Sequence, residues 1–208
     1  MSEPFDELAQ LGSATVFEAS GREGLVDLDL HQVIPGSRAA GPARTVRCGQ
    51  DDILMVHAAM DRVAVGDVLV LTMPEPRPIA LLGELLATQA KARGAAAVLI
   101  DAAVRDTADL RELDLPVWAR WVRVHGANRA DVGELDVPVE MGGASIEPGD
   151  VFVLDSDGAV VVARQRLDEV LAASRERAAN EREKREKFRS GVLSYDLYGL
   201  RSLVEEED

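Results

Sequence analysis

The fold is decided by the stretch Ala95-Ala-Ala-Val-Leu-Ile-Asp-Ala-Ala-Val-Arg105-Asp106. Its centre, Val98-Leu-Ile100, is a short apolar and partly β-branched run, which indicates a buried strand. The seven residues from Thr107 onward read as a helix. Arg105 and Asp106 are therefore predicted to lie in a turn between a strand and a helix, where open α/β sheets place their ligand sites.

Two interpretations of this turn are open. An Arg beside an Asp in such a crevice can hold an anionic substrate with the cation and a hydrated metal ion with the carboxylate. Alternatively, Asp106 or Thr107 caps the helix and Arg105 is a solvated neighbour.

A second candidate site precedes this strand. Gly83-Glu84-Leu85-Leu86 opens a helix predicted over Leu81–Arg93 and closed by Gly94 as a left-handed cap. The free backbone N–H groups and the dipole of a helix start form an anion site. Gly83 lets a ligand approach the backbone closely; on the alternative interpretation it only allows the turn, and Glu84 is a favourable first-turn acid.

The two turns are expected to meet. Val68–Leu71 reads as a buried strand, so the order strand, helix, strand up to Val98–Ile100 is a crossover unit with parallel pairing. Neighbouring parallel strands bring both turns to the same edge of the sheet. An N–H nest, a cation and a carboxylate would then share one crevice.

The remaining segments predict a β-rich layer packed on this βαβ layer. The expected elements are a helix over residues 5–24 with Ser13 or Thr15 capping its second part, a loop through Gly41 and Pro42, a strand over Ala43–Cys48, a helix over Ile53–Val63, a proline-rich loop over Met73–Pro78 at the site rim, a strand over Pro116–Ala119, and a hairpin turning at Asp155–Gly158.

A long helix is predicted from Leu167 to about Arg189, and Glu181 lies on the face that carries its apolar residues. A carboxylate there needs a partner, which is a core Arg, another subunit or the water shell of a metal. Arg185 shares that face, so an ion pair is the simplest explanation. The tail Val192–Leu203 is too apolar to be disordered, so docking on its own domain or on a neighbouring chain is expected, and the acidic residues 205–208 are expected to fray.

Composition excludes several classes of protein. A chain of 208 residues with a net charge of −14 lacks the basic surface that nucleic acid or an anionic membrane requires. No apolar run approaches the roughly 20 residues of a membrane span, and no secretory leader is recognisable. Cys48 is the single cysteine, so an internal disulfide and a cysteine zinc cluster are excluded. A cytoplasmic protein is expected.

Several of these motifs together resemble the RraA-like family. They are Gly83-Glu-Leu-Leu86, Ala90-Lys-Ala-Arg-Gly94, Ile100-Asp-Ala-Ala-Val-Arg-Asp106 and Pro116-Val-Trp-Ala-Arg120. The C-terminal extension is similar to that of the 4-hydroxy-4-methyl-2-oxoglutarate / 4-carboxy-4-hydroxy-2-oxoadipate aldolase branch. The shorter RNase-E-regulator branch lacks such an extension.

The resemblance implies an α/β fold of the swivelling β/β/α type, with a catalytic domain over residues 1–165 and an intersubunit helix and tail over residues 166–208. It implies a homotrimer or a dimer of trimers. The implied activity is that of a class II aldolase that releases pyruvate from 4-hydroxy-2-oxo acids, with oxaloacetate decarboxylation as a side activity.

The resemblance also implies roles for the candidate residues. Asp106 would bind Mg²⁺ or Mn²⁺, and Arg105 would contact the keto or enolate oxygen of the substrate. The backbone of Gly83, Glu84, Leu85 and Leu86 would hold the pyruvyl carboxylate. Glu181 of a neighbouring chain would orient metal-bound waters.

Other readings stay open. The chain has Ala102 and Trp121 where the family usually has glycine or another small residue, and Met73–Pro78 where a glycine-containing loop is expected; these positions are predicted to lie near the pocket and to affect substrate choice. Neither His57 nor His125 belongs to a motif, so no general base is assigned. The alternatives are a non-catalytic regulator that binds other proteins, and a lyase of the same fold acting on a different 2-oxo acid.

Overall fold

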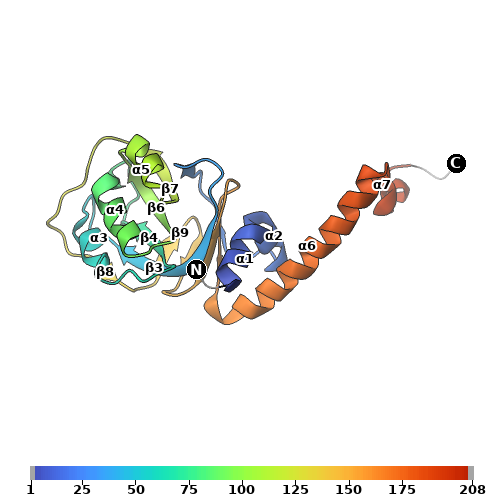
Figure 1. The fold of residues 1–208 in the computed structure, drawn as a ribbon, viewed down its shortest axis with the longest axis horizontal. Coiled ribbons are helices and arrows are strands. Elements are labelled where there is room, and N and C mark those ends of the chain that lie inside the picture. The colour runs from blue at the N-terminus through green and yellow to red at the C-terminus, as the bar shows by residue number, and fades with distance from the viewer. Residues whose placement is uncertain (1–2, 206–208) are drawn as a thin grey trace.

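The computed structural model describes residues 3–205, so the last three residues of the predicted acidic end lie outside the described part. The protein is a mixed α/β fold whose large sheet curls into a half barrel, with a long C-terminal helix (Figure 1). This confirms the predicted α/β class of the swivelling β/β/α type. The sheet order is β1-β12-β11-β3-β4-β6-β7-β2, with β5 beside β6 and β8 beside β3.

The strands are mostly short. They are β1 (Leu25–Val26), β2 (His31–Gln32), β3 (Ala39–Arg47), β4 (Val68–Thr72), β5 (Ala80–Leu82), β6 (Ala97–Val104), β7 (Val117–Val122), β8 (Glu134–Leu135), β9 (Val139–Met141), β10 (Ala144–Ile146), β11 (Val151–Leu154) and β12 (Ala159–Val162). Strand β3 joins the two halves of the sheet, since it pairs with β11 on one side and with β4 on the other. The helices are α1 (Glu3–Leu11), α2 (Ser13–Ala19), α3 (Leu54–Ala59), α4 (Glu84–Ala92), α5 (Thr107–Leu113), α6 (Leu167–Arg189) and α7 (Ser194–Leu197), with 3₁₀ turns η1 (Arg164–Arg166) and η2 (Leu200–Leu203).

The predicted crossover unit is confirmed. Strands β4, β6 and β7 are parallel neighbours, with α4 and α5 in the connections between them. All eight residues of β6 are buried, which explains the apolar run that predicted it. Gly94 has φ +91° after α4, as expected of a left-handed cap.

Strand β3 begins four residues earlier than predicted. Its first half pairs antiparallel with β11 and its second half parallel with β4, so Gly41 and Pro42 lie in a strand and not in a loop. A side chain at position 41 would place its Cβ 2.1 Å from the carbonyl oxygen of Gly66, which explains the glycine. The close approach comes from the fold and leaves no mark in the local sequence.

Three helical predictions need correction. The N-terminal helix is two helices separated at Gly12, and Ser13 does not cap the second one with its side chain, because its N–H and Oγ both donate to Asp155 at 2.8 and 2.6 Å. Helix α3 is shorter than the predicted Ile53–Val63. The helix predicted to start at Leu81 starts at Glu84, because the two leucines before Gly83 belong to β5 beside β6.

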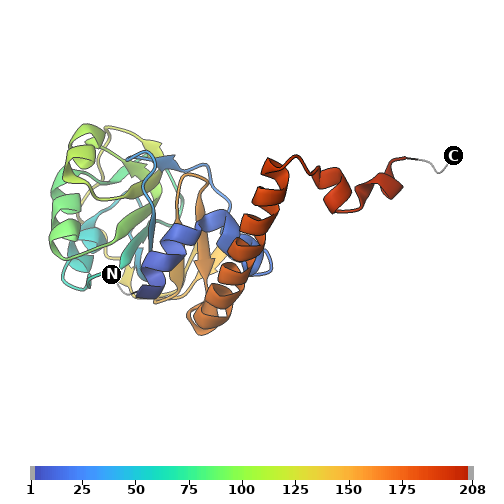
Figure 2. The same cartoon turned by 45° about the vertical axis from the view of Figure 1, so that its right-hand side comes forward.

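Helix α6 has the bounds predicted for it. Its first half packs on α1 and α2 (Figure 2), and Val170 and Leu171 of that half are buried. Its second half and the tail project away from the body. The tail does not dock on its own domain; Tyr198 instead lies edge-on to Phe188 at the end of α6, with ring centroids 6.5 Å apart. The division of the chain at residue 165 stays a prediction.

In the described part of the chain, every helix is too short or too polar to cross a membrane.

Candidate functional site

The two predicted turns do meet at one edge of the sheet. The turn between β5 and α4 lies beside the turn between β6 and α5, because the N–H of Arg105 donates to the carbonyl of Leu82 at 3.0 Å. The carboxylate Oδ2 of Asp106 accepts a hydrogen bond from the N–H of Glu84 at 3.1 Å and lies 3.4 Å from Nε of Arg105. The cation, the carboxylate and the helix start therefore share one crevice.

Asp106 stands at the N-cap position of α5 but does not cap that helix with its side chain. Its backbone is left-handed, with φ 56° and ψ 39°, a conformation that a non-glycine residue adopts at some energetic expense. The carboxylate instead reaches the first turn of α4. The interpretation of Asp106 as a cap of its own helix is therefore wrong.

The glycine at position 83 is explained by the close approach of neighbouring side chains and not by the conformation of the turn. Its φ of −137° is open to any residue. A Cβ at this position would lie 2.4 Å from Oδ2 of Asp106 and 3.0 Å from Nε of Arg105. Only glycine leaves room for both functional side chains beside the start of α4.

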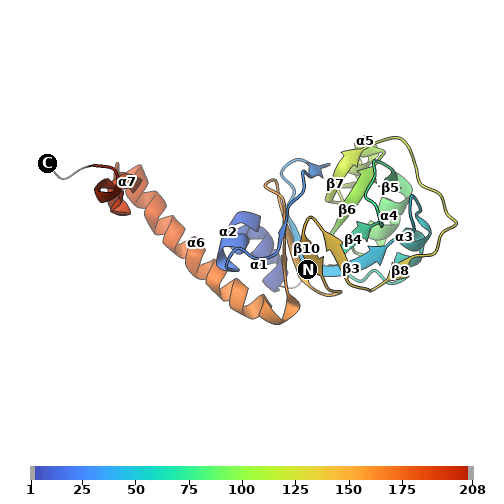
Figure 3. The same cartoon turned by 180° about the vertical axis from the view of Figure 1, so that it is seen from behind.

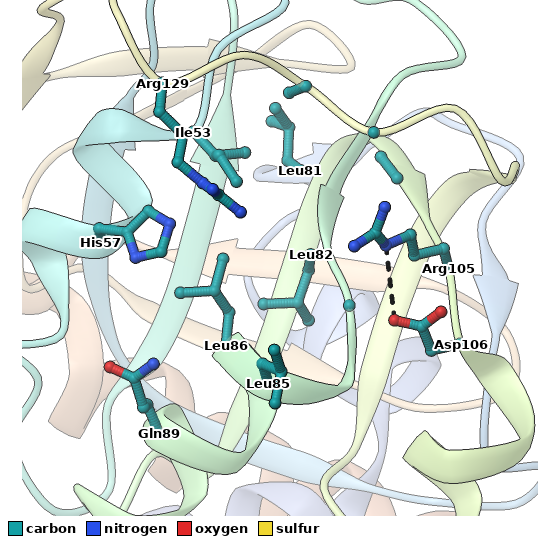
Figure 4. A pocket seen from close by; sticks show the side chains of 14 residues that line it. Ile53, His57, Leu81, Leu82, Leu85, Leu86, Gln89, Arg105, Asp106 and Arg129 are labelled. Carbon is teal, nitrogen blue, oxygen red and sulfur yellow. Dashed lines mark ion pairs between the residues drawn. The ribbon is translucent and has the colours of Figure 1, made fainter.

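These groups border a cavity of about 210 Å³ (Figure 4). Its floor is apolar and includes Ile53, Leu81 and Leu86, all less than 10% exposed. Helix geometry leaves the N–H groups of Leu85 and Leu86 without intrahelical acceptors. Within the predicted carboxylate-binding backbone, the N–H groups of Leu85 and Leu86 are therefore available, whereas the N–H of Glu84 already serves Asp106.

Three polar residues of the cavity wall were not predicted. They are His57 of α3, Gln89 of α4 and Arg129 of the loop after β7, and they lie across the cavity from Arg105 (Figure 4). No local motif marks them, because the fold brings them together from separate segments. His125, by contrast, contributes a backbone carbonyl that accepts the N–H of Ala80 at 2.7 Å.

The positions expected to shape the pocket lie outside its lining. Ala102 is fully buried in the apolar layer beneath the helices. The guanidinium of Arg120 covers the ring of Trp121, with Cζ of Arg120 4.4 Å from the ring centroid. Residues of the Met73–Pro78 loop contact Gln50, whose side chain donates to Glu75 and accepts from it. The departures from the family pattern therefore do not border this cavity.

Asp106 fits a divalent cation as a single protein ligand. No hydrogen bond from the described residues reaches its second oxygen, Oδ1. Mg²⁺ and Mn²⁺ accept one carboxylate with water and substrate oxygens in the other positions. The described residues hold no cluster of three or more His, Cys, Asp or Glu side chains, so the donor set does not fit a metal that needs several protein ligands.

Glu181 lies far along α6, on the part that projects away from α4 and α5 (Figure 3). Its carboxylate pairs with Nε of Arg177 at 2.9 Å, so the predicted pairing with Arg185 is wrong. A contribution of Glu181 to an Asp106 site requires a second copy of the chain, and this stays a prediction.

The family model described as Aldolase/RraA matches residues 11–161. The chain belongs to the RraA-like family. The match contains both turns of the crevice, together with α3 and the loop that carries Arg129.

Three proteins similar to this chain illustrate the range of the matches. A protein of Halalkalibacterium halodurans, provisionally named a 4-hydroxy-4-methyl-2-oxoglutarate aldolase, is 29% identical over 161 residues, 77% of each chain. The structure of an uncharacterized Pseudomonas syringae protein matches with a TM-score of 0.81 and 28% identity, over 91% of this chain and 94% of that one. The structure of RraAS2 of Streptomyces coelicolor, an unusual member of the RNase ES inhibitor RraA family, matches with a TM-score of 0.75 and 30% identity. The match covers 92% of this chain and 98% of RraAS2.

The likeness to RraAS2 bears on the C-terminal extension. Residues 1–166 make up about 80% of this chain, so a match over 92% includes part of α6. The extension therefore does not by itself separate aldolases from RraA regulators. The crevice at Arg105 and Asp106 has to carry the functional argument.

Proposed function

We propose that this RraA-like protein is a divalent-metal-dependent class II aldolase. It cleaves 4-hydroxy-2-oxo acids, such as 4-hydroxy-4-methyl-2-oxoglutarate or 4-carboxy-4-hydroxy-2-oxoadipate, to pyruvate and a second keto acid. Decarboxylation of oxaloacetate is the expected side activity. The observation that carries the proposal is the convergence of Asp106, Arg105 and the start of α4 on one cavity.

Each of these groups has a role in binding a 2-oxo acid. The N–H groups of Leu85 and Leu86, at the positive end of the α4 dipole, bind the C1 carboxylate. The guanidinium of Arg105 donates to the C2 oxygen and stabilises the negative charge that develops there as the C3–C4 bond breaks. The bond from the N–H of Glu84 to Asp106 fixes the carboxylate relative to both groups.

Asp106 would hold Mg²⁺ or Mn²⁺ through its second oxygen. When bound there, the cation supplies Lewis-acid stabilisation of the enolate charge, so a Schiff-base lysine is not required. The cavity lining agrees, since it contains no lysine among the described residues.

A non-catalytic regulator of the RraA type is the second candidate, and the likeness to RraAS2 favours it. Such a protein would work by contact with another protein and would not need Asp106 to bind a metal. A lyase for a different 2-oxo acid is a variant of the first proposal and would keep the same three groups.

Pyruvate release from oxaloacetate and from 4-carboxy-4-hydroxy-2-oxoadipate, with Mg²⁺ or with EDTA, tests the proposal. Asp106→Ala is expected to lower kcat/KM by at least about 100-fold. Asp109→Ala removes the same charge from an exposed position in the first turn of α5 and is the matched control. Absence of pyruvate release by the folded, metal-supplied protein would reject the aldolase; unchanged turnover of Asp106→Ala would reject this site.

A further inference from the structure

The end of the cavity opposite Arg105 has no role in the mechanism above. Figure 4 shows the guanidinium groups of Arg105 and Arg129 on opposite sides of the cavity, both directed inward. In this view Leu81 and Leu82 lie between the two sides, and His57 lies beside Arg129. The cavity therefore has a guanidinium at each end, paired with a carboxylate only at the Arg105 end, and an apolar middle.

Arg129 has no ion pair or hydrogen bond with another described residue. Asp106 is the one carboxylate in the described lining, and it lies on the Arg105 side. A guanidinium directed into a cavity with an apolar floor favours an anion, and its planar fork matches a carboxylate. The described residues supply no such anion.

The backbone on both sides of Arg129 is fixed. Asn128 exchanges two backbone hydrogen bonds of 2.9 Å with Asp51 and Ile53. The N–H groups of Ala130 and Asp131 donate to the buried carboxylate of Asp52, at 2.6 and 3.1 Å. This anchoring limits the conformational entropy that Arg129 loses when it binds a ligand.

We propose that Arg129 is the specificity-determining residue of the cavity and binds the carboxylate at the far end of a dicarboxylic 2-oxo acid. This inference rests on the proposed function, because it assigns the end of the substrate that the start of α4 and Arg105 leave free. In a 4-hydroxy-2-oxo diacid, that far carboxylate stays on the second keto acid after cleavage. Arg129 therefore selects five-carbon and longer diacids over acids that end in a methyl group.

Binding of two unreactive ligands tests the inference without turnover. 2-Oxoglutarate and 2-oxopentanoate have the same five-carbon chain and differ in a far carboxylate against a methyl group. Calorimetry on the full chain with Mg²⁺ should show a preference for 2-oxoglutarate of roughly 10- to 100-fold. Arg129→Gln should abolish that preference, and Arg129→Lys should keep part of it because it retains a point charge.

A matched control and turnover data complete the test. Arg22→Gln removes an exposed guanidinium from the turn after α2, outside the cavity lining, and should keep the full preference. In turnover, Arg129→Gln should lose roughly 10- to 100-fold in kcat/KM on 4-hydroxy-4-methyl-2-oxoglutarate, and much less on 4-hydroxy-2-oxopentanoate, which ends in a methyl group.

The two proposals fail differently. If wild-type protein releases pyruvate but Arg129→Gln keeps the preference for 2-oxoglutarate, the role of Arg129 is overturned and the aldolase stands. If the kcat/KM of Arg129→Gln falls equally on both aldol substrates, Arg129 is not a specificity residue. If wild-type protein releases no pyruvate but prefers 2-oxoglutarate, and Arg129→Gln abolishes that preference, the aldolase proposal fails and the dicarboxylate site stands.

Discussion

The carboxylate of Asp106 caps a helix other than its own: it accepts the N–H of Glu84, 22 residues earlier, at 3.1 Å. One hydrogen bond thus ties the turn after β6 to the start of α4. The two turns hold the groups proposed to bind the carboxylate, the keto oxygen and the metal. Their relative position depends on this bond and on the absence of a side chain at Gly83.

Gly83→Ala should therefore inactivate the protein while leaving it folded. The new Cβ would stand 2.4 Å from Oδ2 of Asp106 and would displace both that carboxylate and Arg105. We expect a loss in kcat/KM of about 100-fold, because displacements of about 1 Å are enough for that. The unfolding free energy should fall by about 1–3 kcal/mol.

Gly36→Ala is the control for this variant. Gly36 has φ +80° and no heavy atom near the position of a Cβ, so alanine strains the backbone away from the site. It should reduce stability and keep activity. Full activity of Gly83→Ala would show that the close approach of Asp106 and Arg105 is not required.

Asp52→Asn should loosen the segment that carries Arg129. Burial tends to raise the pKa of Asp52, but N–H groups of Ala130, Leu54 and Asp131 donate to its carboxylate and hold its pKa below the ordinary value. An amide cannot accept all three bonds without facing an N–H with its own NH₂. We expect a loss of about 1.5–3 kcal/mol in unfolding free energy near pH 7.

The pH dependence has a definite sign. Because the folded pKa of Asp52 is lowered, its contribution is present above the ordinary value of 3.8 and is lost as pH falls through the folded pKa. Urea unfolding of wild type and Asp52→Asn should differ at pH 7 and at pH 5, and the difference should shrink as the pH falls below 3.8. Asp51→Asn, in the same loop, is the control. A difference that does not shrink in acid would contradict a role for the charge.

Arg120→Ala should destabilise the sheet most at high pH. Asp101 is buried in β6, which raises its pKa, while the hydrogen bond from Arg120 at 3.0 Å opposes the rise. Removing Arg120 leaves a buried carboxylate without its partner and should lower the unfolding free energy by about 1–3 kcal/mol near pH 8.

This effect should diminish on acidification. A carboxyl with a raised folded pKa favours the folded state most at low pH and loses that contribution as pH rises through the folded pKa. Denaturation of Arg120→Ala at pH 8 and pH 5 measures the difference. Arg123→Ala, whose guanidinium donates to the carbonyl of Val122, should show no such pH dependence.

The sequence was sufficient to predict the crevice but not its far wall. Arg105 and Asp106 follow a strand that is buried along its whole length, so the end of the apolar run marks their turn. The start of α4 carries its own local signal. Both belong to consecutive crossover units, whose geometry is the same in all parallel sheets.

Arg129, His57 and Gln89 could not be predicted in this way. Each lies on a different segment, and the loop of Arg129 is placed by Asp52, about 80 residues earlier in the chain. Strand β3 was misjudged for a similar reason, because the glycine and proline at its start are loop residues by propensity. Their place in the sheet follows from pairing with β11, whose position depends on the whole fold.

A mixing experiment tests whether Glu181 completes the site of a neighbouring chain. In the isolated chain its carboxylate pairs with Arg177 on the half of α6 that projects away from α4 and α5 (Figure 3). If α6 crosses to a neighbour, Asp106→Ala and Glu181→Ala should each be inactive. Unfolded together and refolded as mixed oligomers, they should regain activity.

The expected gain follows from symmetry. In a cyclic oligomer each site takes Asp106 from one chain and Glu181 from the next, so random mixing restores both in about a quarter of the sites. Asp106→Ala mixed with the double variant Asp106→Ala/Glu181→Ala restores none and is the control. Recovery near a quarter of wild-type turnover would place Glu181 across the interface. If both single variants are inactive and the mixture gains nothing, the two residues do not act across chains; full activity of Glu181→Ala would remove that residue from the mechanism.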